Sequence, residues 1–247
     1  MSKLTEQIPL PSKGLLYPKS SPLSAGYVEL KYMNASHEDI LTNINYIKQG
    51  TVINKLLSSL LPKEVKVDEL LVGDKNAVMI AARILGYGKD YNFSIRNPQD
   101  EKEKVNITID LTKLPEKELD AKLIKSQENP NEFFFTLPNT GTEVSFRLLT
   151  SGDEDKIEEE LKNLKQKLGT SPNVTTRLKH ILLSVGGERD PKKIREFVDT
   201  LVAIDAKALR SYVNKITPNV ELKYEYDFGQ GLEEGSVPIT GEFFWPE

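Results

Sequence analysis

The chain alternates between two hydrophobic periods, one typical of strands and one typical of helices. Val28, Leu30 and Tyr32 are separated by charged residues, which is the two-residue period of a half-buried strand. Ser36, followed by an acid three residues later, then favours the start of a helix that continues to Gly50. Beyond this point the pattern predicts helices over about 51–61 and 74–85, and a hairpin over 91–95 and 105–109.

The second half of the chain repeats this order. Val144, Phe146 and Leu148 alternate as a strand, and a helix that begins near Ser151 carries one apolar stripe. The pattern then predicts further helices over about 174–184, 191–200 and 204–216, and a final hairpin built on 222–228 and 237–239.

Two offsets relate the halves and predict a duplication. A shift of 116 residues places the strand Val28, Leu30 and Tyr32 on Val144, Phe146 and Leu148. A shift of 131 residues places Leu70-Leu71 and Asp74 on Leu201-Val202 and Asp205. We therefore expect an α+β fold of two similar units, 27–112 and 142–241, each with a strand, a cluster of helices and a β-hairpin. The alternative is that these short matches reflect shared periodicity alone.

Proline-rich apolar segments mark the start of the chain. Residues 8–11 and 15–18 set apolar side chains among prolines, which disfavour helix and remove backbone donors. The sequence predicts an extended N-terminal arm over 1–26 that lies on another surface, either its own domain or a partner. A connector with a strand is expected over 113–141.

An aromatic tail follows the second unit, over 242–247. Phe243, Phe244 and Trp245 include the only tryptophan of the chain, and such side chains are favoured anchors at protein interfaces. The alternative is that they pack on the chain's own core. The predicted partner-binding residues are taken from both ends: Leu15, Leu16, Tyr17, Phe243, Phe244 and Trp245.

Charge and composition narrow the classes of partner. The 247 residues carry 33 basic and 37 acidic side chains, a net charge of −4 with the signs interspersed. This balance argues against broad binding to nucleic acid, which needs a positive surface. The sequence also has no apolar run long enough for a membrane span. We expect neither nucleic acid nor membrane as a partner.

The side chains that support catalysis or metal binding are scarce. The absence of cysteine excludes disulfides, thiolate catalysis and cysteine-ligated metals. His37 and His180 are the two histidines, and neither belongs to a nucleophile or phosphate-loop motif. The acidic run at 153–160 alternates with apolar residues and precedes lysines, as in the solvated face of a helix. The sequence therefore predicts no catalytic residue, no cofactor and no metal site.

Several short segments carry a resemblance when they are taken together and in order: 11–18, 68–74, 81–88, 137–141, 146–150 with 153–154, and 243–246. They resemble one family, the baseplate hub subunit and hub-assembly family of contractile-tailed bacteriophages (myoviruses). The resemblance implies a non-enzymatic structural protein of the viral tail, in the baseplate hub or at its contact with the wedges. It implies assembly in the host cytoplasm, a place in the virion, other baseplate and tail proteins as partners, and several copies per particle.

One feature departs from the family pattern, and two alternatives stay open. Members of the family can carry cysteine pairs in the hairpin turns, where this chain has residues 97–100 and 228–231 without a thiol. A metal role is therefore not expected. The first alternative is a hub-assembly factor that is absent from the mature virion. The second is a cell-wall hydrolase, which the poor supply of histidines and catalytic motifs disfavours.

Overall fold

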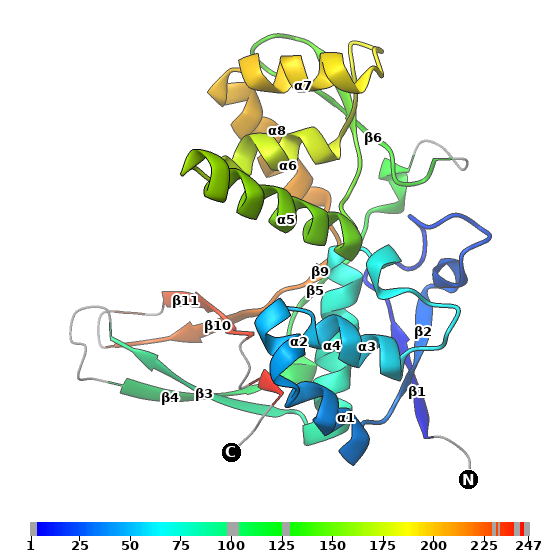
Figure 1. The fold of residues 1–247 in the computed structure, drawn as a ribbon, viewed down its shortest axis with the longest axis vertical. Coiled ribbons are helices and arrows are strands. Elements are labelled where there is room, and N and C mark those ends of the chain that lie inside the picture. The colour runs from blue at the N-terminus through cyan, green and yellow to red at the C-terminus, as the bar shows by residue number, and fades with distance from the viewer. Residues whose placement is uncertain are drawn as a thin grey trace.

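The computed structural model describes residues 4–97, 104–124, 129–228, 231, 233–239 and 243–244. Its helices and small antiparallel sheets confirm the predicted α+β class (Figure 1). The helices are α1 Ala35–Leu41, α2 Ile44–Gln49, α3 Val52–Leu60, α4 Val72–Tyr87, α5 Ser151–Leu168, α6 Asn173–Ile181, α7 Pro191–Thr200 and α8 Ala203–Ile216. The strands are β1 Thr5–Pro9, β2 Tyr27–Lys31, β3 Asp90–Arg96, β4 Lys104–Asp110, β5 Glu116–Lys117, β6 Phe133–Thr136, β7 Glu143–Phe146, β8 Leu182–Val185, β9 Asn219–Val220, β10 Lys223–Tyr226 and β11 Glu233–Ser236.

The protein has two lobes that do not coincide with the two halves of the sequence (Figure 1). One lobe contains α5 to α8 and the sheet β6-β7-β8. The other contains the sheet β1-β2, helices α1 to α4, and both hairpins, β3-β4 and β10-β11. The hairpins touch where Phe93 and Tyr224 meet edge to face, with ring centroids 4.9 Å apart. The predicted unit 142–241 is therefore split, because its hairpin packs on the hairpin of the first half.

The described part of the N-terminal segment packs on the chain's own domain, which is one of the two surfaces expected for the extended arm over 1–26. Strand β1 pairs antiparallel with β2, so that Ile8 lies opposite Val28. Turns and a short 3-10 helix at Pro22–Ala25 connect the two strands. Prolines disfavour helix but are compatible with a strand at a sheet edge. Residues 5–9 form a strand because they pair with β2, which lies about twenty residues further along the chain. The local sequence pattern therefore could not predict this strand.

Two predicted helices have different boundaries in the structure. The helix expected from 36 to 50 is divided into α1 and α2, because the side chain of Asn43 accepts hydrogen bonds from the N–H groups of Asn45 and Tyr46 and starts a new helix. The helix expected over 174–184 ends at Ile181, and 182–185 continue as β8, which pairs with β7.

The strand pairs β1-β2 and β6-β7 have the same register when the two Leu-Pro-x-x-Gly segments, 10–14 and 137–141, are aligned. Ile8 lies opposite Val28 in the first half, and Phe135 lies opposite Val144 in the second. A capping box follows each sheet, formed by Asn34 with His37 at α1 and by Thr150 with Asp153 at α5. The halves differ beyond this point, because β8 and α7 follow α6 in the second half. The two-unit duplication stays a prediction.

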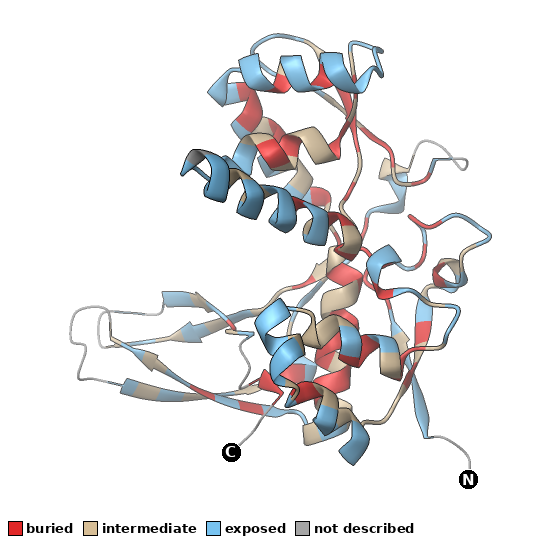
Figure 2. Ribbon diagram, viewed as in Figure 1, coloured by how far each residue is buried: buried red, intermediate tan, exposed pale blue. Residues whose placement is uncertain are grey.

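One continuous core extends through both lobes, and helix α4 lies near its centre (Figure 2). Val78 and Ala82 on α4 are fully buried, as is Leu70 in the segment that leads into this helix. The next residue, Leu71, forms an antiparallel bridge with Thr150 of the other lobe. The start of α4 is therefore the place where the two lobes are joined.

Candidate interaction site

A buried carboxylate holds the N-terminal segment onto α4. Asp74, in the first turn of α4, is inaccessible to solvent. It accepts hydrogen bonds from the Ser12 N–H at 2.9 Å, from the Ser12 hydroxyl at 2.6 Å and from the Tyr17 hydroxyl at 2.6 Å. Burial raises the pKa of Asp74, while the hydrogen bonds from Ser12 and Tyr17 act in the opposite direction by stabilising the ionised form. Asp74 thus fixes the turn at 10–14 against the helix.

Tyr17 connects this carboxylate to the junction between the lobes. Its hydroxyl donates to Asp74 and accepts the N–H of Leu71 at 2.8 Å. Burial and the nearby charge of Asp74 raise the pKa of Tyr17 far above its usual value, so the hydroxyl keeps its proton at neutral pH. The side chain is therefore committed to a structural hydrogen-bond network.

The second half has a corresponding arrangement. Asp205, in the first turn of α8, is buried and accepts the N–H groups of Asn139 at 2.8 Å and Thr140 at 3.2 Å. These residues lie in the turn 137–141, which connects β6 to β7 as 10–26 connects β1 to β2. Both turns follow a Leu-Pro-x-x-Gly pattern. In each half, a buried aspartate near the start of a long helix holds the turn after the first strand.

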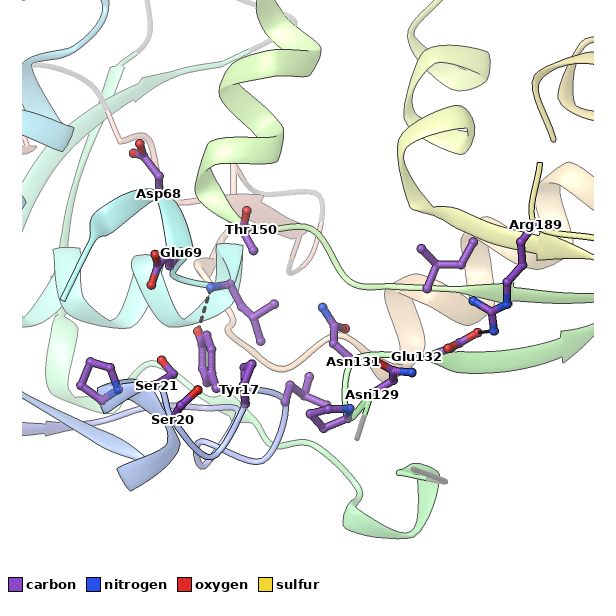
Figure 3. A pocket seen from close by; sticks show the side chains of 16 residues that line it. Tyr17, Ser20, Ser21, Asp68, Glu69, Asn129, Asn131, Glu132, Thr150 and Arg189 are labelled. Carbon is purple, nitrogen blue, oxygen red and sulfur yellow. Dashed lines mark hydrogen bonds and ion pairs between the residues drawn. The ribbon is translucent and has the colours of Figure 1, made fainter. Parts of the chain in front are cut away.

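A groove of about 780 Å³ opens beside Tyr17, between the two lobes (Figure 3). Its walls come from the segment after the turn at 10–14, from the loop before α4, and from residues 129–132 before β6 together with parts of the α5–α8 lobe. The lining residues are Leu16, Tyr17, Pro18, Ser20, Ser21, Pro22, Asp68, Glu69, Leu71, Asn129, Pro130, Asn131, Glu132, Thr150, Leu183 and Arg189.

The groove has an acidic wall and a wall with a paired charge. Asp68 and Glu69 are exposed on the wall formed by the loop before α4 (Figure 3), and Glu69 pairs with Lys66, which lies outside the lining, at 3.2 Å. On the second wall, Arg189 contacts the nearly buried carboxylate of Glu132 at 2.6 Å. Because Arg189 compensates the Glu132 charge and Lys66 compensates the Glu69 charge, Asp68 is the acid of the lining that forms no ion pair with a described residue.

The floor of the groove is held by hydrogen bonds to the backbone. The Asn131 side chain donates to the Leu148 carbonyl and accepts the Leu148 N–H, both at 2.9 Å. Thr150 caps α5 together with Asp153, which also forms a two-point pair with Arg147 at 2.7 and 2.9 Å. Burial opposes ionisation of Asp153, but the hydrogen bonds from Arg147 and Thr150 outweigh it and lower its pKa. The groove is therefore preformed.

The six predicted partner-binding residues differ in how far they are buried. Leu16, Tyr17, Phe243 and Phe244 are buried in the chain's own core, which is the alternative stated for them above. Tyr17 is held by its hydrogen bond to Asp74, and Phe243 packs edge-on against Tyr91 with ring centroids 5.0 Å apart. Leu15 is 39% exposed, and Trp245 lies outside the described residues. For the four buried side chains, the prediction of partner anchors is therefore corrected, because they belong to the chain's own core.

The two histidines have structural partners. His37 accepts the N–H of Asn34 at 3.0 Å in its capping box, and His180 lies 2.9 Å from the Glu160 carboxylate. Within the described parts of the chain, no group of three or more histidine, aspartate or glutamate side chains has a geometry that could hold a metal ion. No helix in those parts is both long and apolar enough to cross a bilayer.

Comparisons of the chain with protein-family models, with curated proteins and with solved structures find no match. The structure does place two of the motifs that carry the phage resemblance. Residues 11–18 and 137–141 form the segments held by Asp74 and Asp205. Sequence reasoning aligned the two aspartates but missed the groove and the carboxylate-held turns. The recurring Leu-Pro-x-x-Gly pattern, followed at a similar distance by aspartate, was the available signal.

Proposed function

We propose that the protein is a non-enzymatic structural component of a contractile phage tail baseplate, in the hub or at the hub–wedge contact. It acts in tail assembly through protein–protein interfaces. The observation that carries the proposal is the ordered set of resembling motifs, of which 11–18, 68–74 and 146–150 contribute lining residues of the groove. A hub-assembly factor that leaves before the virion matures is the alternative within the same class.

Detection of the chain in purified virions tests this proposal. We expect quantitative mass spectrometry of tails purified to constant composition to find the chain at a fixed ratio to other baseplate proteins. The assembly-factor alternative predicts the chain in assembling tails but not in mature particles. Absence from both would contradict the proposal. Degradation of purified cell walls by the isolated chain would instead support the hydrolase.

The groove is the surface that we assign to a partner subunit. Its apolar lining includes Leu183 and three prolines, and Asp68 is an acid of the lining without an ion pair among the described residues. A preformed groove that combines apolar and hydrogen-bonding groups suits an extended segment that buries apolar side chains. The groove would therefore receive an extended segment of another baseplate protein that carries a lysine or arginine beside Asp68.

Reversing the charge at Asp68 is expected to weaken incorporation into tails. Asp68→Lys replaces attraction of a basic side chain by repulsion, and we expect a loss of up to about tenfold, because a partly exposed charge pair contributes modestly. Glu64→Lys is the matched control, because Glu64 is exposed nearby but does not line the groove. Incorporation is measured by competition between tagged variant and unmodified chain. If both variants are incorporated equally well, the groove is not part of the interface with the partner subunit.

A further inference from the structure

The two lobes meet in a short antiparallel bridge between Leu71 and Thr150. The Val72 N–H donates to the Leu149 carbonyl at 3.1 Å, and the Ser151 N–H donates to the Leu70 carbonyl at 2.7 Å. The bridge therefore joins the segment before α4 to the segment between β7 and α5. Leu70 and Leu71 are almost completely buried there.

Each of these two segments has a counterpart elsewhere in the chain. Val202 precedes α8 as Leu71 precedes α4, and the buried Asp205 and Asp74 follow each of them by three residues. Asn34 precedes α1 as Thr150 precedes α5, and both residues cap their helix in a capping box. The sheets before these caps share one register, as described above.

The two counterpart segments, 201–204 and 33–36, are largely exposed, whereas the segments of the existing junction, 70–73 and 149–152, are buried or half-buried. Leu71 is 3% exposed, whereas Val202 is 42% exposed and nearby Ile204 is 61% exposed. On the other side, Thr150 is half-buried in the lobe junction, whereas residues 34–36 are exposed. One molecule thus contains one junction whose two segments are paired, and two further segments that could form the same junction but are largely exposed.

We propose that a second copy of this chain completes the second junction. The segment 201–204 of one molecule pairs with the segment 33–36 of the next, as 70–73 pairs with 149–152 within the chain. The bridge would join Val202 to Asn34. The proposal does not rest on a role in a phage baseplate, because it is argued from the lobe junction alone.

The hydrogen-bonding groups needed for this pairing are available. Ala35 and Ala203 are the first residues of α1 and α8, so their N–H groups have no acceptor within their own helix. By the pattern of the existing junction, the Ala35 N–H would donate to the Leu201 carbonyl and the Ala203 N–H to the Met33 carbonyl. Val202 and Ile204 would add apolar burial beside these bonds.

The new contact differs from the existing junction at one position. Gly73 lets the Pro218 carbonyl approach α4 so closely that no side chain could stand there, whereas its counterpart Ile204 carries a large one. Pro218 lies outside the opposing segment 149–152, so the Ile204 side chain would lie beside the paired backbones and add apolar burial at the edge of the contact. Because the two surfaces differ, the contact is head-to-tail and produces a ring or a filament.

Self-association of the purified chain is the first test. We expect the weight-average mass in sedimentation velocity to rise above 27.8 kDa with concentration. The surface is small, so dissociation constants of about 10 µM to 1 mM are expected, and the range to scan is about 5 µM to 1 mM. A chain that stays monomeric throughout this range would overturn the proposal and leave the surface to a different protein.

Two substitutions remove one surface each and suit the local fold. Ile204→Glu places an acid in the first turn of α8, where the helix dipole favours it. Ala35→Pro removes the proposed donor at the first position of α1, where proline is well accepted after the extended Asn34. We expect a dissociation constant raised at least about tenfold by the first and about five- to tenfold by the second.

Ile44 supplies matched controls for both substitutions. It is 65% exposed and is the first residue of α2, after the extended Asn43. Ile44→Glu and Ile44→Pro should leave self-association unchanged, and circular dichroism melts should show all four variants folded. If either variant of the proposed surfaces is not folded, Ala203→Pro, which removes the other donor, takes its place. Wild-type self-association in the folded variants would overturn the proposal.

Mixing the two variants gives a result that only a head-to-tail contact predicts. Each variant alone lacks one surface, but together they hold one intact pair, since Ala35→Pro keeps 201–204 and Ile204→Glu keeps 33–36. The mixture should form a one-to-one pair of twice the chain mass and nothing larger. A mixture that stays monomeric while the wild type associates would overturn the proposed pairing.

Discussion

Replacement of Asp74 by alanine is expected to lower the free energy of unfolding by about 3–5 kcal/mol, the range for breaking a buried charged network. Three donors, two from Ser12 and one from Tyr17, converge on this carboxylate in a site without solvent access. Without Asp74 these donors stay buried and lose their acceptor. The cost is large because the Tyr17 hydroxyl also receives the Leu71 N–H at the junction between the lobes.

Asparagine should not rescue this site. The Ser12 and Tyr17 hydroxyls already accept the N–H groups of Gly14 and Leu71, so both direct their protons toward Asp74. Both hydroxyls donate to Oδ2 and the Ser12 N–H donates to Oδ1, so the NH₂ group of an asparagine would face either both hydroxyls or the Ser12 N–H. We therefore expect Asp74→Asn to cost about 2–4 kcal/mol, close to the alanine variant.

Two further variants control the Asp74 experiment, which is measured by urea unfolding at neutral pH. Asp205→Ala should cost less, about 1–3 kcal/mol, because the Asn139 and Thr140 N–H groups lie in a partly exposed turn that water can reach. Asp39→Ala, at an exposed position of α1, should change stability by less than about 0.5 kcal/mol. Equal, small effects for Asp74 and Asp39 would show that the carboxylate network contributes little.

The elements that sequence reasoning predicted are those with a local physical cause. Val28 and Leu30 alternate with charged residues because one face of β2 is buried and the other is not. Helix α2 ends at Gly50 because this residue adopts a left-handed conformation with φ of 70°, which glycine accepts without strain. Such signals act within a few residues and are visible in the sequence.

The elements that sequence reasoning missed depend on residues far away in the chain. Strand β1 exists because β2 pairs with it, and β8 exists because the edge of β7 is open to it. Both segments have apolar residues that fit more than one structure, so their conformation is decided by the sheet they join. For the same reason, the local pattern could not tell that the second hairpin packs on the first.

The candidate site shows the same division. The prolines around Tyr17 indicated an extended segment with apolar side chains that must be covered. They did not indicate the cover, because Asp74 lies 57 residues from Tyr17. An aspartate within an apolar helix pattern is equally compatible with a solvated face. Only the position of α4 beside the turn at 10–14 makes it a buried acceptor.

Truncation of Phe243 to alanine is expected to destabilise the protein by about 3–5 kcal/mol, the usual cost of removing a buried phenylalanine side chain. Phe243 has no solvent access and packs edge to face on Tyr91 and on Phe244, with centroids 5.0 and 5.1 Å apart. Tyr91 in turn donates to the Pro238 carbonyl at 2.9 Å. Removal of the ring therefore leaves a cavity at the base of both hairpins, where the surrounding structure can relax only in part.

The same variant separates a core role from a partner-binding role. Leu15→Ala is the matched comparison, because Leu15 was predicted as an anchor with Phe243 but remains 39% exposed. We expect Leu15→Ala to change the unfolding free energy by less than about 0.5–1 kcal/mol, and Phe243→Ala to lower the melting temperature by several degrees or more. Both quantities are measured by thermal and urea unfolding of the purified chain. If Phe243→Ala keeps wild-type stability but no longer enters tails, its ring serves a partner. If it unfolds more easily, the ring stabilises the chain's own hairpins, and Leu15 is left as the exposed anchor among the described candidates.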